Sequence, residues 1–231
     1  MMWDQRAQRA RFLAGRYAVS REILNFYAGL AEWQGEVAKR ISTLKQLREF
    51  FPSLLDLVLR TGPPALASTA RELTTPSFDH LVSEYWDSPG QFSTLEFFAR
   101  AMLQPYAGNL PGSLDCPWCK RPPQAGCLRP QGEGLAFEVV CSLCLRRRPF
   151  PRTRCPGCNE SSEEKLATFA AEDFPHLRLQ VCEICRGYLI VVDFSRDIAA
   201  IPEVDELAGL PLDLWAVEHN YCKLQPNLAG I

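Results

Sequence analysis

The chain has 231 residues, of which 47% are hydrophobic and 23% charged, and its formal net charge is −2. This composition excludes a disordered chain, and the small net charge excludes a general attraction to nucleic acid or membranes. The chain has no run of 18 apolar residues, so no membrane span is predicted. The first 20 residues are polar and lack the apolar core of a signal peptide, so we expect a cytoplasmic protein.

Residues 1–112 are predicted to form an α-helical domain. Apolar side chains recur at three- and four-residue spacing between residues 5 and 50. Pro52, Pro64 and Pro76 mark the starts of further helices, and Ser93 and Glu96 form a capping-box pattern ahead of a last one. The arginines of the first helix are expected to face solvent; they are Arg6, Arg9, Arg11, Arg16 and Arg21.

Residues 107–113 are rich in glycine and proline and mark a domain boundary. After it, short β segments are predicted at residues 135–140, 166–169, 177–181 and 188–192. Helices are expected again near residues 204–208 and 212–217. The predicted fold class is therefore α plus small β: a helical domain (1–112), two tandem modules (113–151 and 152–200) and a helical tail (201–231).

Four Cys-x-x-Cys pairs dominate the second half of the chain. Each such turn places two thiolates on one side of a tight loop, and two turns together present four sulfurs in the tetrahedral arrangement that zinc or rubredoxin-type iron favours. In a reducing compartment, paired thiols indicate metal far more often than disulfides, although a disulfide framework is the alternative. The eight predicted ligands are Cys116, Cys119, Cys141, Cys144, Cys155, Cys158, Cys182 and Cys185.

An internal repeat indicates how the pairs are grouped. The Cys-Pro-x-Cys pattern at Cys116 recurs 39 residues later at Cys155, and the Val-Cys-x-x-Cys pattern at Cys141 recurs 41 residues later at Cys182. A duplicated unit therefore favours sequential sites, pairs one and two in the first module and pairs three and four in the second. The alternative is a cross-brace in which pairs one and three share a metal.

The remaining cysteines and histidines have plainer interpretations. Cys127 and Cys222 are expected to be small buried residues, with Cys127 as a spare ligand in the alternative. His176 lies inside the second unit and could replace a thiolate, but four cysteines are already available there.

Charge is distributed unevenly over the second half of the chain. Residues 120–154 carry eight basic and two acidic side chains, whereas residues 159–231 carry five basic and thirteen acidic ones, a polarity that could orient a protein partner. A basic cluster precedes the third pair, and we favour a partner-protein role for it over nucleic acid; it comprises Arg146, Arg147, Arg148, Arg152 and Arg154.

In these motifs the chain resembles the FdhE family, the accessory proteins of formate dehydrogenase formation. The resemblance covers residues 114–222 and includes the segment that follows Cys182 and the stretch 205–213 after the last pair. Lys120 and Arg148 depart from the family's pattern, and the helical part is shorter than usual. The resemblance implies a helical domain, two rubredoxin-like modules that hold iron, a cytoplasmic location, and action on the catalytic subunit of respiratory formate dehydrogenases.

We therefore predict an assembly factor that binds this catalytic subunit, is not an enzyme, and holds two metal ions, iron by the resemblance or zinc. The rival hypothesis is a double zinc ribbon that binds nucleic acid, or a partner in nucleic-acid machinery, through residues 146–154. A thiol-disulfide enzyme would need a βαβ context that residues 114–200 do not show. The sequence makes no prediction of oligomeric state.

Overall fold

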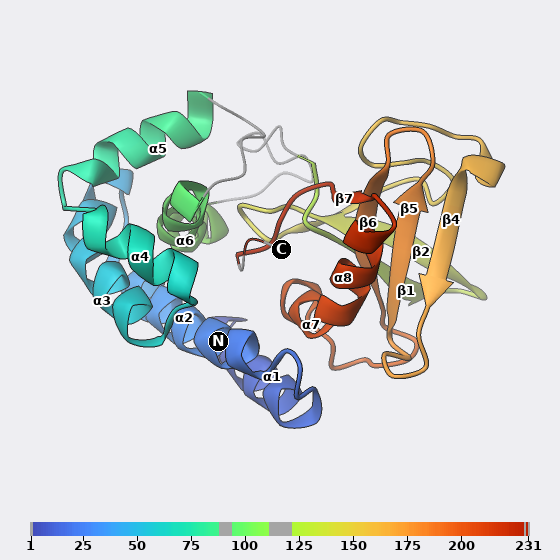
Figure 1. The fold of residues 1–231 in the computed structure, drawn as a ribbon, viewed down its shortest axis with the longest axis horizontal. Helices are drawn as coiled ribbons and strands as arrows, with labels where there is room; N and C mark the ends of the chain where they lie inside the picture. Colours follow the sequence, from blue (N-terminus) through green and yellow to red (C-terminus); the bar gives the residue numbers. More distant parts are fainter. Residues whose placement is uncertain (1, 88–93, 111–121, 229, 231) are drawn as a thin grey trace.

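The computed structural model describes residues 2–87, 94–110, 122–228 and 230. The first half of the chain is helical and the second half is built on one sheet (Figure 1). The helices of the first half are α1 (Met2–Arg16), α2 (Arg21–Arg40), the 3-10 helix η1 (Leu44–Phe50), α3 (Phe51–Thr61), α4 (Pro64–Glu72), α5 (Ser77–Asp87) and α6 (Thr94–Asn109).

The predicted helix starts agree with the structure where proline sets them. Pro52 and Pro64 lie in the first turns of α3 and α4, where a missing N–H breaks no intrahelical hydrogen bond. α5 begins at Ser77, just after the expected start at Pro76. The capping box expected at Ser93 lies outside the described residues.

The described residues of the second half form seven strands and two further α-helices. The strands are β1 (Ala125–Gln131), β2 (Gly134–Val140), β3 (Arg147–Pro149), β4 (Leu166–Ala170), β5 (Leu177–Cys182), β6 (Gly187–Asp193) and β7 (Cys222–Lys223). The short 3-10 helix η2 (Glu163–Lys165) precedes β4, and α7 (Pro202–Ala208) and α8 (Leu210–Glu218) follow β6.

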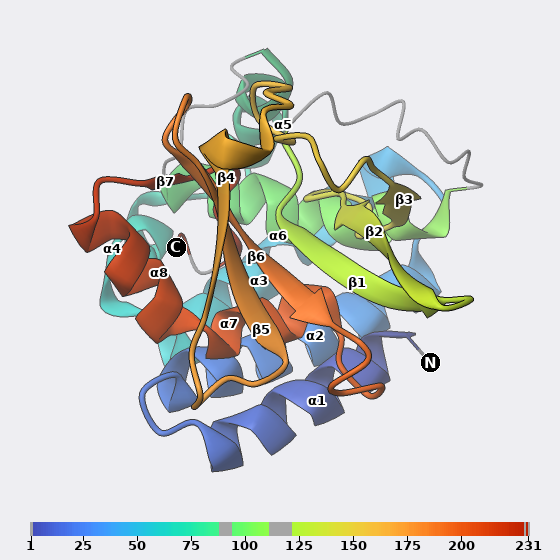
Figure 2. The same cartoon turned by 90° about the vertical axis from the view of Figure 1, so that its right-hand side faces the viewer.

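The strands of the two expected modules join in a single sheet of order β3-β2-β1-β6-β5-β4, with β7 paired to β6. The strands of β3-β2-β1 and of β6-β5-β4 are antiparallel to their neighbours, but β6 pairs in parallel with β7 and, through residues 191–193, with residues 126–128 of β1. The two repeat units therefore share one sheet, which the pattern of short strands did not predict. Figure 2 shows this sheet from its β4 side.

β1 is the longest of the three strands that the sequence did not predict, the others being the short β3 and β7; Gly126 and Pro130 interrupt its pattern. Both are tolerated for local reasons. A Cβ on Gly126 would lie 2.8 Å from Phe137, so the residue must be small for β1 and β2 to pack. The register of β1 with β6 ends at Leu128, so Pro130 lies beyond that pairing and its missing N–H removes no bond to β6.

One apolar core runs through both halves of the chain, from α1 and α2 through α7 to β5 and β6. Two arginines of α1 contradict the expected solvent exposure. Arg6 is 2% exposed and donates to Glu203 of α7 at 2.5 Å, and Arg9 is 8% exposed and pairs with Asp205. α7 carries the matching carboxylates, so these arginines join the helical half to the sheet half.

Among the described residues, no helix combines the length and the apolar character that crossing a membrane requires.

Candidate metal centre

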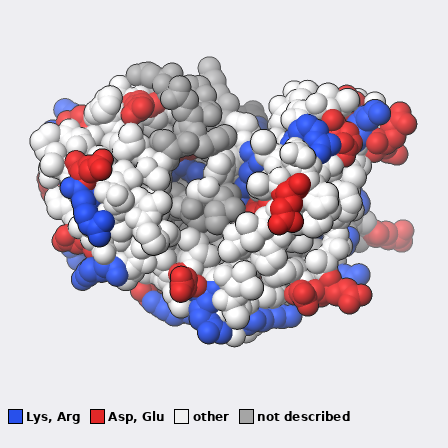
Figure 3. All heavy atoms as spheres, viewed as in Figure 1, with Lys and Arg blue, Asp and Glu red and all other residues white. Residues whose placement is uncertain are grey.

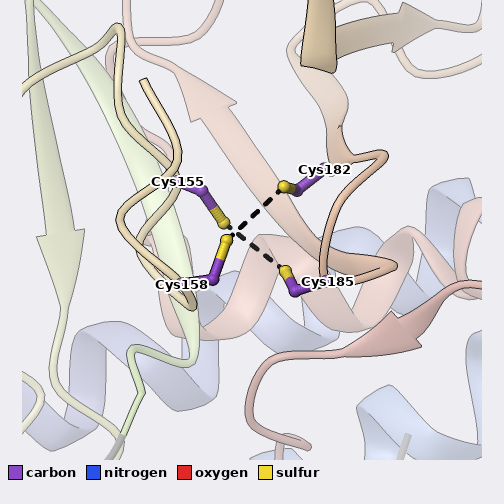
Figure 4. Close-up of side chains that lie close together, drawn as sticks. All are labelled: Cys155, Cys158, Cys182 and Cys185. Carbon is purple, nitrogen blue, oxygen red and sulfur yellow. Dashed lines mark hydrogen bonds between the residues drawn. The ribbon is translucent and has the colours of Figure 1, made fainter. Parts of the chain in front are cut away.

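The structure brings the third and fourth cysteine pairs together. Cys155 and Cys158 lie on the loop before β4, Cys182 ends β5, and Cys185 closes the turn into β6. All four sulfurs lie within 4.8 Å of one another and point toward a common centre (Figure 4). This is the sequential grouping predicted from the repeat, and it excludes a cross-brace for these two pairs.

The sulfur separations match metal coordination and not disulfides. Cys155 Sγ lies 3.7 Å from Cys185 Sγ, and Cys158 Sγ lies 3.7 Å from Cys182 Sγ. A disulfide would require about 2 Å. In a tetrahedron with metal–sulfur bonds of about 2.3 Å, the sulfurs stand about 3.8 Å apart. The four side chains are therefore arranged for one tetrahedral ion.

Three described Cys-x-x-Cys turns end in the same backbone conformation. The residue after the second cysteine has a positive φ in each: 57° at Leu145, 64° at Asn159 and 55° at Arg186. Because this region is unfavourable for non-glycine residues, a shared constraint must hold it. The turns at Cys141 and Cys155 also share a hydrogen bond from the residue after the pair to the first cysteine's carbonyl, at 3.1 and 2.9 Å.

Backbone N–H groups and burial set the electrostatics of the sulfurs. The Gly157 N–H donates to Cys155 Sγ at 3.3 Å. Burial raises the pKa of Cys155 and of Cys185, whereas the backbone N–H of Glu160 lowers the pKa of Cys158. Metal ligands must be thiolates, so a bound cation would supply the charge that four close sulfurs need to ionise together.

Leu224, just after β7, covers the centre and was not predicted as part of it. Its Cδ2 atom would lie 2.5 Å from a Cβ on Gly157 and 2.4 Å from a Cβ on Gly187. The Gly187 Cβ would also lie 3.1 Å from Cys185 Sγ. Both turns therefore need glycine so that the leucine can pack against them, on one side of a centre whose Cys158 and Cys185 are exposed.

The second cysteine pair is anchored on the helical half. The carbonyl of Ser142, inside the Cys141–Cys144 turn, accepts hydrogen bonds from Arg100 at 3.2 Å and Gln104 at 3.0 Å, both on α6. The Leu143 N–H donates to Cys141 Sγ at 3.4 Å, as Gly157 does to Cys155. The first pair, Cys116 and Cys119, lies outside the described residues.

Comparisons with known proteins agree with the motif resemblance. A protein named FdhE homolog from Aquifex aeolicus is 24% identical over 94% of this chain and 92% of its own length. The FdhE homolog of Pseudomonas aeruginosa is 35% identical over 49% of this chain. The crystal structure of the FdhE protein from Pseudomonas aeruginosa aligns with a TM-score of 0.72 over 98% of this chain and 94% of that one, at 24% identity.

The expected resemblance to the FdhE family is confirmed. The match with the Pseudomonas aeruginosa relative spans 38% of that protein's length, and the fold agrees with the solved FdhE structure nearly throughout. No family model matches the chain. The chain thus resembles FdhE proteins both in sequence and in its mixed helical and sheet fold.

The five arginines of the basic cluster do not share one face. Arg146 donates to the carbonyl of Leu110. Arg147 and Arg148 follow each other in β3, so their side chains point to opposite faces of the sheet. Arg152 and Arg154 are exposed, and Arg152 lines a groove of about 490 Å³ across the outer face of the sheet.

The other sequence candidates lie away from the four sulfurs. Cys127 is fully buried in β1 and contacts Glu138, and burial raises its pKa to about 12. Cys222 is exposed in β7, which contradicts its expected burial. His176 Nε2 lies 3.0 Å from an oxygen of Asp205, a buried contact between the residue that precedes β5 and helix α7.

His176 also lies close to Asp197 and Asp205, a set of ligand types that could suggest a second kind of metal site. Arg9 already provides the cation there, since its Nη2 lies 2.6 Å from Asp197 and also pairs with Asp205. This cluster is therefore an internal ion-pair network between α1 and α7.

Proposed function

We propose that the chain is a cytoplasmic accessory protein of formate dehydrogenase formation, which binds the enzyme's catalytic subunit and is not itself a catalyst. The resemblance to FdhE proteins over nearly the whole chain supports this role. So does the construction of the second half, where the paired cysteines form small turns and four of them converge on one centre.

The metal part of the proposal rests on one observation: the sulfurs of Cys155, Cys158, Cys182 and Cys185 all lie within 4.8 Å of one another. We propose that this set holds one ion and that Cys141 and Cys144, with Cys116 and Cys119, hold a second. Both units would then be rubredoxin-like or zinc-ribbon modules within the shared sheet. Iron is the metal implied by the resemblance, and zinc fits the same four sulfurs.

Metal binding would have a structural role. The Cys182 end of β5 pairs with Leu166 of β4, and the backbone N–H of Glu183 donates to the Lys165 carbonyl at 2.9 Å. An ion bound at the sulfurs would thus fix both the loop before β4 and the turn between β5 and β6. The free energy of metal binding is then part of the free energy of folding.

Direct binding tests the client part of the proposal. The metal-loaded chain and the purified catalytic subunit of a respiratory formate dehydrogenase should co-elute in size-exclusion chromatography and show a saturable Kd by calorimetry. An unrelated protein of similar size and net charge is the control. A client role would be contradicted if the chain did not bind the catalytic subunit, or if it bound the control protein equally well.

A further inference from the structure

Within the described residues, β4 is an edge strand of the sheet that pairs on one side only. It is the terminal strand of the order, pairs with β5 on one side, and lies at the right-hand margin in Figure 1. Thr168, Phe169 and Ala170 are exposed. The opposite edge, β3, has three residues and contains Pro149, a device that blocks further pairing. β4 has five residues and no proline.

The register identifies which N–H groups of β4 point outward. The Glu183 N–H donates to Lys165, so this pair is hydrogen-bonded, and pairs alternate along an antiparallel ladder. Leu166, Thr168 and Ala170 are therefore the non-hydrogen-bonded positions, whose N–H and C=O groups face away from β5. The Leu166 N–H already donates to the Glu163 carbonyl, so the groups left for an added strand are the Leu166 carbonyl and the N–H and C=O groups of Thr168 and Ala170.

Acidic side chains stand at both ends of this row. Glu163 and Glu164 precede β4, and Glu172 and Asp173 follow it; all four are exposed, and none takes part in an ion pair within the described part of the chain. Lys165 is the single basic residue between residues 159 and 174. Figure 3 shows carboxylates, with Lys and Arg side chains among them, along the right-hand margin, where β4 lies in Figure 1.

An aromatic surface adjoins the edge. Phe169 is 39% exposed and its ring centroid lies 4.8 Å from that of Trp215 on α8, which stacks on His219 at 3.9 Å. Alternate side chains of an added strand would lie beside this apolar surface. Leu214 and Val217 on α8 are 52% and 61% exposed, so this helix is apolar on its outward side as well.

We propose that the β4 edge receives an extended, basic segment of the client protein as an additional strand. Positive side chains flanking about five residues would face the two acidic ends, which are separated by about 17 Å of strand. A second copy of this chain fits poorly, since antiparallel β4–β4 pairing would set acidic ends against acidic ends. The inference rests on the proposed client role and locates it on β4 instead of on the arginine cluster.

The test is a Thr168→Pro substitution with Thr168→Ala as its matched control. Proline removes the central outward N–H but leaves the β4–β5 bonds intact, because the Thr168 N–H does not face β5. Alanine keeps that N–H. With purified catalytic subunit as the probe, we expect at least a tenfold weaker Kd for Thr168→Pro and less than a twofold change for Thr168→Ala.

Hydrogen exchange of the wild-type chain provides a second readout that needs no variant. The amides of Thr168 and Ala170 should exchange more slowly when the catalytic subunit is bound, and binding should weaken as salt increases. If the wild type binds while these amides stay unprotected and Thr168→Pro binds normally, the β4 inference is wrong and the client role stands. If the wild type does not bind, the client role fails first.

Discussion

Glu206 of α7 makes a buried pH-sensitive contribution to stability that can be measured. Its side chain is fully buried between Gln124, which donates to it, and Lys223, whose Nζ lies 3.1 Å away. Lys223 also lies 3.1 Å from Asp213. One cation thus serves two buried carboxylates, and burial raises the pKa of Glu206 from 4.5 to about 7.

The sign of the effect follows from where the proton is held. Between pH 4.5 and 7 the folded chain keeps the Glu206 proton that the unfolded chain has lost, so the free energy of unfolding decreases as pH rises through this range. A pKa difference of about 2.5 corresponds to a total loss of about 3 kcal/mol. Of this, about 1 kcal/mol falls between pH 6 and 8.

The assay is urea unfolding of the metal-loaded wild type and of Glu206→Gln at pH 6, 7 and 8. Glutamine cannot ionise, so its advantage over the wild type should grow by about 1 kcal/mol across this range. Glu72→Gln changes an exposed carboxylate and serves as control. A constant difference between wild type and Glu206→Gln from pH 6 to 8 would refute a raised pKa at this residue.

Two further substitutions test the packing described above. Arg9→Met leaves a buried aspartate without its guanidinium and should lower the free energy of unfolding by about 3–5 kcal/mol, whereas Arg11→Met, which breaks an exposed ion pair, should change it by less than about 1 kcal/mol in the same urea titration. Gly187→Ala should displace Leu224 and so increase the rate at which a chelator removes the metal, measured as metal released over time. Gly15→Ala is the control, because a Cβ at Gly15 would have open space around it. Equal release rates for the two variants would show that the leucine does not protect the sulfurs.

The strands β2, β4, β5 and β6 and the sulfur centre were predictable because their signals are local. The apolar residues at 135–140 and the continuous apolar run at 188–192 predicted β2 and β6. The repeat of the Cys155 and Cys182 patterns predicted which cysteine pairs meet. Predicting these features requires only the periodicity of apolar residues and the residue types found in turns, both of which can be read along the chain.

The features that sequence reasoning missed depend on contacts between distant segments. The burial of Arg9 follows from Asp205, 196 residues later, and its own helix gives no sign of that partner. The parallel pairing of β1 with β6 joins two units that each resemble a separate module. The role of Leu224 depends on a return of the chain to the cysteine turns after α8.

The most direct test of the account is the metal content of the Cys155–Cys185 centre. Protein purified without oxygen should contain about two metal ions per chain by elemental analysis, and Cys182→Ser should contain about one. Bound iron would give visible absorption that this substitution reduces, and zinc would leave the protein colourless. A chain that holds no ion, or a Cys182→Ser variant with the wild-type content, would contradict the central claim that these four sulfurs bind a metal.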